Sequence, residues 1–163
     1  MSHRIRVVEH EAILALSKRM PVRLAGIGPT LGETFGDLYG HLAMSGVEPA
    51  GPPFVLYHSM PTADLPLDIE VCAPVSALAE APAGCTVGWI PGGSFATLLH
   101  VGPYEAIGSA YDELATWVER HHRELVGPPR ETYLSEPETP PAEIRTILEW
   151  PVSEARVPVG ARS

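Results

Sequence analysis

Long apolar runs, cysteines and basic residues are all scarce in this chain. The longest apolar runs fall far short of the ~20 residues that cross a bilayer, and no basic-then-apolar leader precedes a cleavage site. We therefore expect a cytoplasmic protein with no membrane partner. Cys72 and Cys85 are the two cysteines and lack CxxC spacing, and the histidines show no ligand spacing. We expect no disulfide framework, no metal and no cofactor.

Positive charge is also in short supply, because 11 basic residues stand against 20 acidic ones and the formal net charge is −9. This balance repels a phosphate backbone, so we expect no direct binding of nucleic acid. It is compatible with cationic ligands, although acidic surfaces more often serve solubility. Phosphate-binding loops, dinucleotide fingerprints and nucleophile elbows are absent as well.

Four landmarks of the sequence occur twice in the same order. The chain has 163 residues, 45% of them hydrophobic, which suits a single domain over residues 1–163. The offsets between the copies are 74, 76, 76 and 77 residues. The landmarks are Gly28-Pro29 and Gly102-Pro103, Gly51-Pro52-Pro53 and Gly127-Pro128-Pro129, Tyr57 and Tyr133, and Pro74-Val75 and Pro151-Val152. We expect a duplicated unit, with repeat one over about 5–75, repeat two over about 84–152, and a loosely attached tail over 153–163.

Hydrophobic periodicity predicts the elements of each copy. Helices are expected over 29–44, where glycines weaken the pattern, and over 104–121. Strands are expected over 5–8, 13–16, 54–58, 67–72, 86–90, 95–101, 131–134 and 144–150, with a loop over 60–66 and a hairpin turn at 91–94. The resulting fold is α+β: a tandem pseudo-twofold repeat of strand (or hairpin)-helix-strand-strand units, with antiparallel sheets, helices on one side and a central cleft.

Several ordered motifs give the chain a family resemblance. They are His100-Val-Gly-Pro-Tyr104, Tyr111 to Trp117, Gly127 to Pro137 and Arg145 to Val152, with Gly46 to Pro53, Tyr57-His58 and Asp68 to Val75 in the first half. Together they resemble the GyrI-like, or AraC-type effector-binding, small-molecule domain over about residues 5–152. The resemblance implies a cleft that binds amphipathic, often cationic, organic molecules, including multiple drugs. Some members carry a DNA-binding domain and regulate transcription, but we expect a free-standing domain here.

Glu131 and Tyr133 are the first-choice binding pair. They lie two residues apart on a predicted strand and so share a face, where a carboxylate among aromatic rings can hold an organic cation. Glu131 also matches a position where the resemblance implies an acid. A solvated glutamate on an exposed strand explains it equally well.

Glu70 and Glu149 are further candidate acids of the site. The counterpart of Glu70 in the second copy is Ile147, where relatives often have a second glutamate, and Glu149 lies two residues on. The site, if present, is therefore asymmetric. Tyr57, Trp89, Tyr104 and Trp150 are candidate lining residues, whereas Tyr111 and Trp117 fit a core stripe better.

Three functions stay open at this point. The first is binding of hydrophobic, cationic small molecules such as drugs, toxins or metabolites, for sensing or sequestration. The second is hydrolysis of reactive cyclopropane-type natural products, with Glu131 and Tyr133 as catalytic residues. The third, ranked last, is a protein-interaction role that modulates DNA gyrase. The last two follow from what the family resemblance implies.

Overall fold

The computed structural model describes residues 5–59, 65–136 and 138–155, and the chain divides into two compact units. Unit 1 comprises residues 1–10, 93–129 and 134–163, and unit 2 comprises residues 11–92 and 130–133. The predicted tail over 153–163 is described only to residue 155, and residues 60–64 of the predicted loop lie outside the described residues. Ser153 is well attached, because its amide donates to the carbonyl of Glu124 at 2.9 Å.

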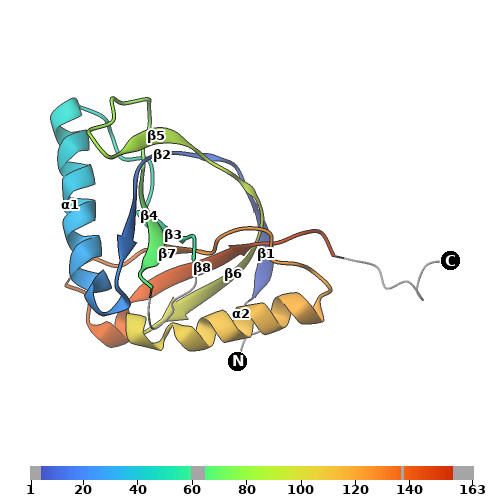
Figure 1. Cartoon of the computed structure of the whole chain (residues 1–163). Helices are drawn as coiled ribbons and strands as arrows, with labels where there is room; N and C mark the ends of the chain where they lie inside the picture. Colours follow the sequence, from blue (N-terminus) through green and yellow to red (C-terminus); the bar gives the residue numbers. More distant parts are fainter. Residues whose placement is uncertain (1–4, 60–64, 137, 156–163) are drawn as a thin grey trace. The chain divides into compact units, whose positions relative to one another are not determined.

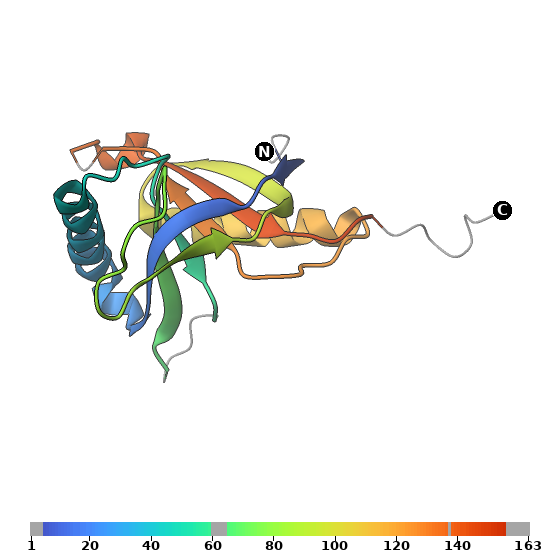
Figure 2. The ribbon, with the colours of Figure 1, turned by 90° about the horizontal axis from the view of Figure 1, so that it is seen from above.

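Unit 2 is an antiparallel sheet with one helix on one face (Figures 1 and 2). Its strands are β2 (Ile13–Val22), β3 (Phe54–Tyr57), β4 (Leu67–Pro74), β5 (Thr86–Ile90) and β7 (Arg130–Tyr133), and its helix is α1 (Ile27–Ser45). The order across the sheet is β7-β3-β4-β2-β5, with every neighbouring pair antiparallel. The predicted pair of strands over 54–58 and 67–72 is thus confirmed.

Alternation along β4 fixes the two faces of this sheet. Leu67, Ile69 and Val71 are buried in a cluster with Leu38 and Leu42 of α1. The intervening residues point the other way, because successive side chains of a strand alternate between faces. We call these the helix face and the open face of unit 2.

Helix α1 ends at a glycine. Gly46 adopts the left-handed conformation with φ 68°, and its amide and that of Val47 bond to carbonyls of the last turn. A side chain would be strained there, so glycine is the fitting terminator. Thr34, Leu38 and Leu42 are the buried residues of the helix, at spacings of four that place them on one stripe.

Unit 1 repeats the plan of one helix on an antiparallel sheet. Its strands β1 (Arg6–His10), β6 (Gly93–Val101) and β8 (Arg145–Pro151) pair in the order β1-β6-β8, and α2 (Gly108–Arg120) packs on β6. The predicted helix over 104–121 begins instead with a 3-10 turn at Tyr104–Ala106; two more such turns lie at Leu24–Gly26 and Pro141–Glu143.

The predicted hairpin around residues 91–94 is wrong. β5 pairs with β2, while β6 pairs with β1 on one edge and β8 on the other, so both edges of β6 are occupied by other strands. A tight-turn sequence between two apolar runs predicts a hairpin only if the runs pair with each other. Here the chain passes from unit 2 to unit 1 between Gly92 and Gly93.

Candidate ligand-binding site

Strands β3 and β7 bring a glutamate and two tyrosines together on the helix face of unit 2. In their antiparallel register Val55 is paired with Glu131, and Val55 belongs to the cluster beneath α1. Tyr57 and Tyr133 follow two residues after these and therefore share their face. Both tyrosines pack against the same cluster.

The three polar groups form one hydrogen-bonded cluster, which we call the Glu131 cluster. The Tyr133 hydroxyl donates to Oε1 of Glu131 at 3.0 Å, and the Tyr57 hydroxyl lies 3.4 Å from the same oxygen. The two hydroxyls are 3.2 Å apart. The Phe35 ring of α1 meets the Tyr133 ring edge to face, with centroids 6.2 Å apart. The carboxylate thus lies against two tyrosines, and Phe35 packs on the ring of one of them.

Burial controls the electrostatics of this cluster. Glu131 is only 6% exposed. Burial raises the pKa of Tyr133 well above that of a free tyrosine, and the neighbouring Glu131 charge and the Tyr57 hydroxyl raise it further. Tyr133 therefore stays protonated and continues to donate its hydrogen bond at physiological pH.

Glu70 lies on the open face, away from the Glu131 cluster. It pairs with Leu56 of β3 and alternates with Ile69 and Val71, which face the helix. His58 Nε2 lies 2.9 Å from Glu70 Oε1, and the buried Ser17 hydroxyl donates to Oε2 at 2.8 Å. Within unit 2 the two candidate acids therefore occupy opposite faces of one sheet.

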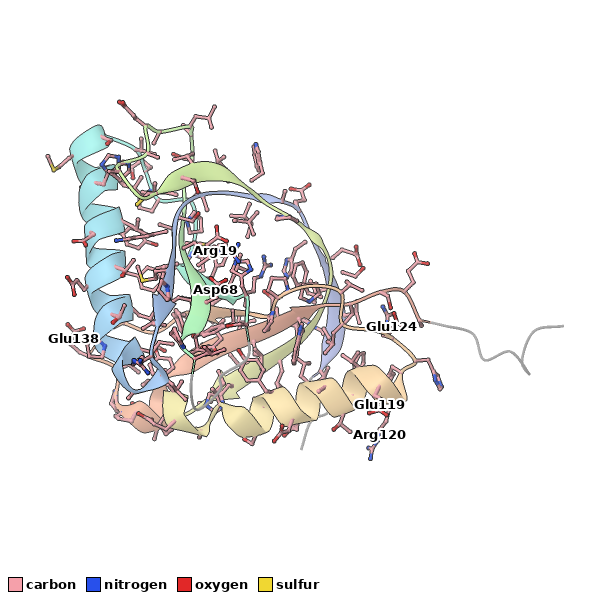
Figure 3. The ribbon with its side chains drawn as sticks, in the orientation of Figure 1. Arg19, Asp68, Glu119, Arg120, Glu124 and Glu138 are labelled. Carbon is pink, nitrogen blue, oxygen red and sulfur yellow. The ribbon has the colours of Figure 1, made fainter. Side chains whose placement is uncertain are left out.

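A bidentate ion pair neighbours Glu70 on the same strands. Arg19 of β2 donates to Asp68 of β4 at 3.0 and 2.7 Å, and Figure 3 shows the two side chains together. The hydrogen bonds from Arg19 hold the pKa of Asp68 below its ordinary value. Both side chains are largely exposed, so the pair adds little to stability.

Glu149 lies in unit 1 and is also held by a histidine and a hydroxyl. It is 5% exposed, accepts a hydrogen bond from Thr97 Oγ1 at 3.0 Å, and contacts Nε2 of His10. Sequence reasoning missed His10, His58, Ser17, Thr97 and Phe35. Spacing along the chain carries no signal for them, because each meets its partner only through strand register or helix packing.

Two of the remaining aromatic candidates, Trp150 and Tyr104, belong to unit 1, and Trp89 belongs to unit 2. Trp150 belongs to the core of unit 1, where its ring meets Tyr111 edge to face and its Nε1 donates to the Gly127 carbonyl at 3.1 Å. Trp89 on β5 is 68% exposed, and Tyr104 in its 3-10 turn is 43% exposed.

Two hollows in unit 2 are lined by residues outside the Glu131 cluster. One of about 630 Å³ is lined by Arg19, Asp68 and neighbours around Pro66, and one of about 370 Å³ lies between Tyr39 and Pro49. Among the residues described, no three His, Cys, Asp or Glu side chains gather as a metal-ligand set. In the same part of the chain, no helix is long and apolar enough to cross a membrane.

Fold and site together define a small α+β domain in which an antiparallel sheet, backed by one helix, holds a buried acid among tyrosines. The GyrI-like small molecule binding domain matches residues 1–153. The chain therefore belongs to the GyrI-like family. Among curated proteins, none matches the sequence significantly.

Four solved structures are similar to this chain in fold. The crystal structure of the EcmrR C-terminal domain is 25% identical, with a TM-score of 0.79 over 95% of this chain and 100% of that one. EcmrR in a DNA complex is also 25% identical, with a TM-score of 0.83 over 93% of this chain, which spans only 58% of that protein. A Listeria innocua hydrolase is 16% identical, with a TM-score of 0.69 over 93% of each chain. SAV2435 bound to tetraphenylphosphonium is 12% identical, with a TM-score of 0.60 over 93% of this chain and 94% of that one. The last two share the fold.

Proposed function

We propose that this domain binds hydrophobic organic cations and that the Glu131 carboxylate holds their charge. The observation that carries the proposal is a 6% exposed carboxylate that accepts hydrogen bonds from Tyr57 and Tyr133, with the Phe35 ring packed on Tyr133. A buried charge is costly unless opposite charge or donors compensate it, so a cation gains most where a carboxylate has been withdrawn from water. Aromatic rings cover the apolar body of such a ligand and attract its charge.

The two hydroxyl donors on Glu131 keep its carboxylate oriented in the absence of a ligand, because both hydrogen bonds end on Oε1. Since Glu131 is so little exposed, a ligand reaches it only after ring movement at Phe35 or the tyrosines. We therefore expect tyrosine and phenylalanine signals to change on binding.

The test compares two ligands of one shape and opposite charge. Tetraphenylphosphonium, the cation bound by SAV2435, and tetraphenylborate differ mainly in the sign of their charge. Isothermal titration with the whole chain should give binding of the cation and none, or far less, of the anion. Glu131→Gln keeps the shape and removes the charge, and should weaken cation binding by about 10- to 100-fold, as for loss of a partly buried ionic contact.

Glu70→Gln is the matched control, because Glu70 is a mostly buried carboxylate of the same unit on the open face. The proposal expects it to leave cation affinity unchanged. Equal binding of both ligands, or an affinity that Glu131→Gln leaves intact, refutes the charge role of Glu131. A loss confined to Glu70→Gln would transfer the site to the open face.

Hydrolysis at the same cluster is a second candidate, favoured by the 3.0 Å bond between the Tyr133 hydroxyl and Glu131. Glu131 would act as general base toward water, and Tyr133 would donate a proton to the leaving carbon or oxygen. Mass spectrometry of cyclopropane-containing substrates checks this. Turnover that is lost in both Glu131→Gln and Tyr133→Phe supports it, and intact substrate throughout opposes it.

Sensing and sequestration both follow from the proposed binding. EcmrR pairs a domain like this one with further sequence, since this chain spans 58% of it, and it is seen bound to DNA. We propose that the present domain supplies the ligand-recognition step in either setting. No observation in the described residues favours a gyrase-directed role over these.

We also propose that the domain arose from the duplicated unit expected from the sequence. Two isolated bridges support this, Pro49 with Val75 and Leu125 with Val152, because they are offset by 76 and 77 residues. The Val55–Glu131 pair lies 76 residues apart within the β3–β7 register. The two copies therefore carry different residues at this position, a valine in the first and a glutamate in the second.

A further inference from the structure

Strand β5 is an unprotected sheet edge. It pairs with β2 on one side, and no described residue pairs with its other side, which Figure 1 shows on the outer border of unit 2. Its five residues, Thr86 to Ile90, include no charge and no proline. Edge strands of soluble proteins are usually guarded by charged residues, prolines or bulges, because their free backbone groups are a template for another strand.

Trp89 gives this unpaired edge an exposed apolar side chain. It is a large apolar side chain on β5, and it is 68% exposed. Its register partner on β2 is Leu14, and the next pair on the same face is Leu16 with Val87. The edge therefore presents two apolar rows that run up to the border of the sheet.

We propose that β5 is a docking edge for a second copy of this chain, joined by antiparallel β5–β5 pairing centred on Gly88. In that register Val87 of each copy lies opposite Trp89 of the other, and Thr86 lies opposite Ile90. Aromatic and β-branched residues in direct opposition are favourable cross-strand pairs. The row Leu14–Trp89 of one copy then continues into the row Val87–Leu16 of the other copy.

Charge favours a second copy as the occupant. A strand without charge meets an identical strand without repulsion, and a twofold interface must be complementary to itself. Strand β1, the edge strand of unit 1, is a contrast within the same chain. Self-pairing of β1 about Val8 would place Arg6 opposite His10 and Val7 opposite Glu9, which offers no apolar row.

The proposed dimer is weak and concentration-dependent. One five-residue strand on each side buries less than a standard interface. The net charge of −9 per chain opposes association, so added salt should strengthen it by screening that repulsion.

The test uses sedimentation velocity on the full chain over a series of concentrations. The wild type should shift from 17.5 kDa toward twice that mass as concentration rises. Trp89→Lys and Trp89→Glu should each raise the dimer dissociation constant at least about tenfold, because the two residues at position 89 are diagonal neighbours and become like charges. An equimolar mixture of the two variants should recover the dimer, since Lys then meets Glu across the axis.

Met44→Lys is the matched control, because Met44 is a 92% exposed apolar residue on α1. It should associate as the wild type does. Circular dichroism checks that the Trp89 variants keep their fold, which their exposure allows. A wild type that stays at 17.5 kDa at every concentration overturns the proposal. So does a mixture of the two variants that dimerises no better than each alone, which would place association elsewhere.

Discussion

Helix α1 carries four glycines spaced four residues apart, at positions 28, 32, 36 and 40. A Cβ built on any of them meets nothing within 4 Å, and none has positive φ. Alanine fits at each position without displacing a neighbour. Glycine inside a helix costs about 1 kcal/mol relative to alanine, so each glycine lowers the stability of a helix that packing against the sheet must restore.

We therefore predict that Gly32→Ala together with Gly36→Ala stabilises the protein by about 2 kcal/mol. For a chain of this size, that corresponds to a rise of roughly 4–8 °C in melting temperature. Thermal unfolding followed by circular dichroism at 222 nm measures it, because α1 is the longer of the two helices described. The two single variants should each give about half of the effect.

Gly46→Ala is the matched control, since it makes the same chemical change at the C-cap of the same helix and should have the opposite effect on stability. Gly46 has φ 68°, where a Cβ is strained, so alanine should cost about 1 kcal/mol. The prediction rests on open space around the helix glycines and on the backbone angle of Gly46. It is refuted if Gly32→Ala and Gly36→Ala leave the melting temperature unchanged, or if Gly46→Ala does not lower it.

Three more predictions concern the reactivity of the cysteines, the stability at alkaline pH and the close contact at Gly127. Burial raises the pKa of Cys72, so a disulfide reagent at pH 8 should leave it unlabelled until denaturant is added, whereas the less buried Cys85 reacts sooner. The pKa of Tyr133 is raised in the folded state. The contribution of Tyr133 to the free energy of unfolding is therefore full below pH ~10 and is lost as the pH rises through the folded pKa. The melting temperature of Tyr133→Phe should consequently fall less at alkaline pH than that of the wild type. Gly127→Ala places a Cβ 3.2 Å from the Pro151 ring and should lower the free energy of unfolding by about 1–2 kcal/mol in urea titrations.

Local pattern accounts for how well the elements were predicted. The strand expected over 54–58 is β3 at Phe54–Tyr57, and the one over 67–72 is β4 at Leu67–Pro74. Alternation and turn residues act over a few residues, so they are readable from neighbours alone. The strand expected over 13–16 instead runs to Val22, because pairing with β4 continues through Lys18 and Pro21.

The candidate site was readable from sequence only where it is local. Glu131 and Tyr133 share a face because they are two residues apart on one strand, and their 3.0 Å hydrogen bond confirms this geometry. Tyr57 joins them from 74 residues away through the β3–β7 register. Glu70 is an acid of β4, the strand next to β3. It lies on the opposite face, because the register pairs it with Leu56 and not with Val55, the partner of Glu131.

By itself, the sequence determined the helices, most strand positions, the family resemblance and the Glu131–Tyr133 pair, because each of these depends on spacing of a few residues or on ordered motifs. The tertiary structure alone decided that β5 pairs with β2 and β6 with β1. It also decided that Glu70 and Glu149 each meet a histidine. Strand pairing is a choice among distant partners of similar local pattern, and only the packing of the whole sheet selects between them.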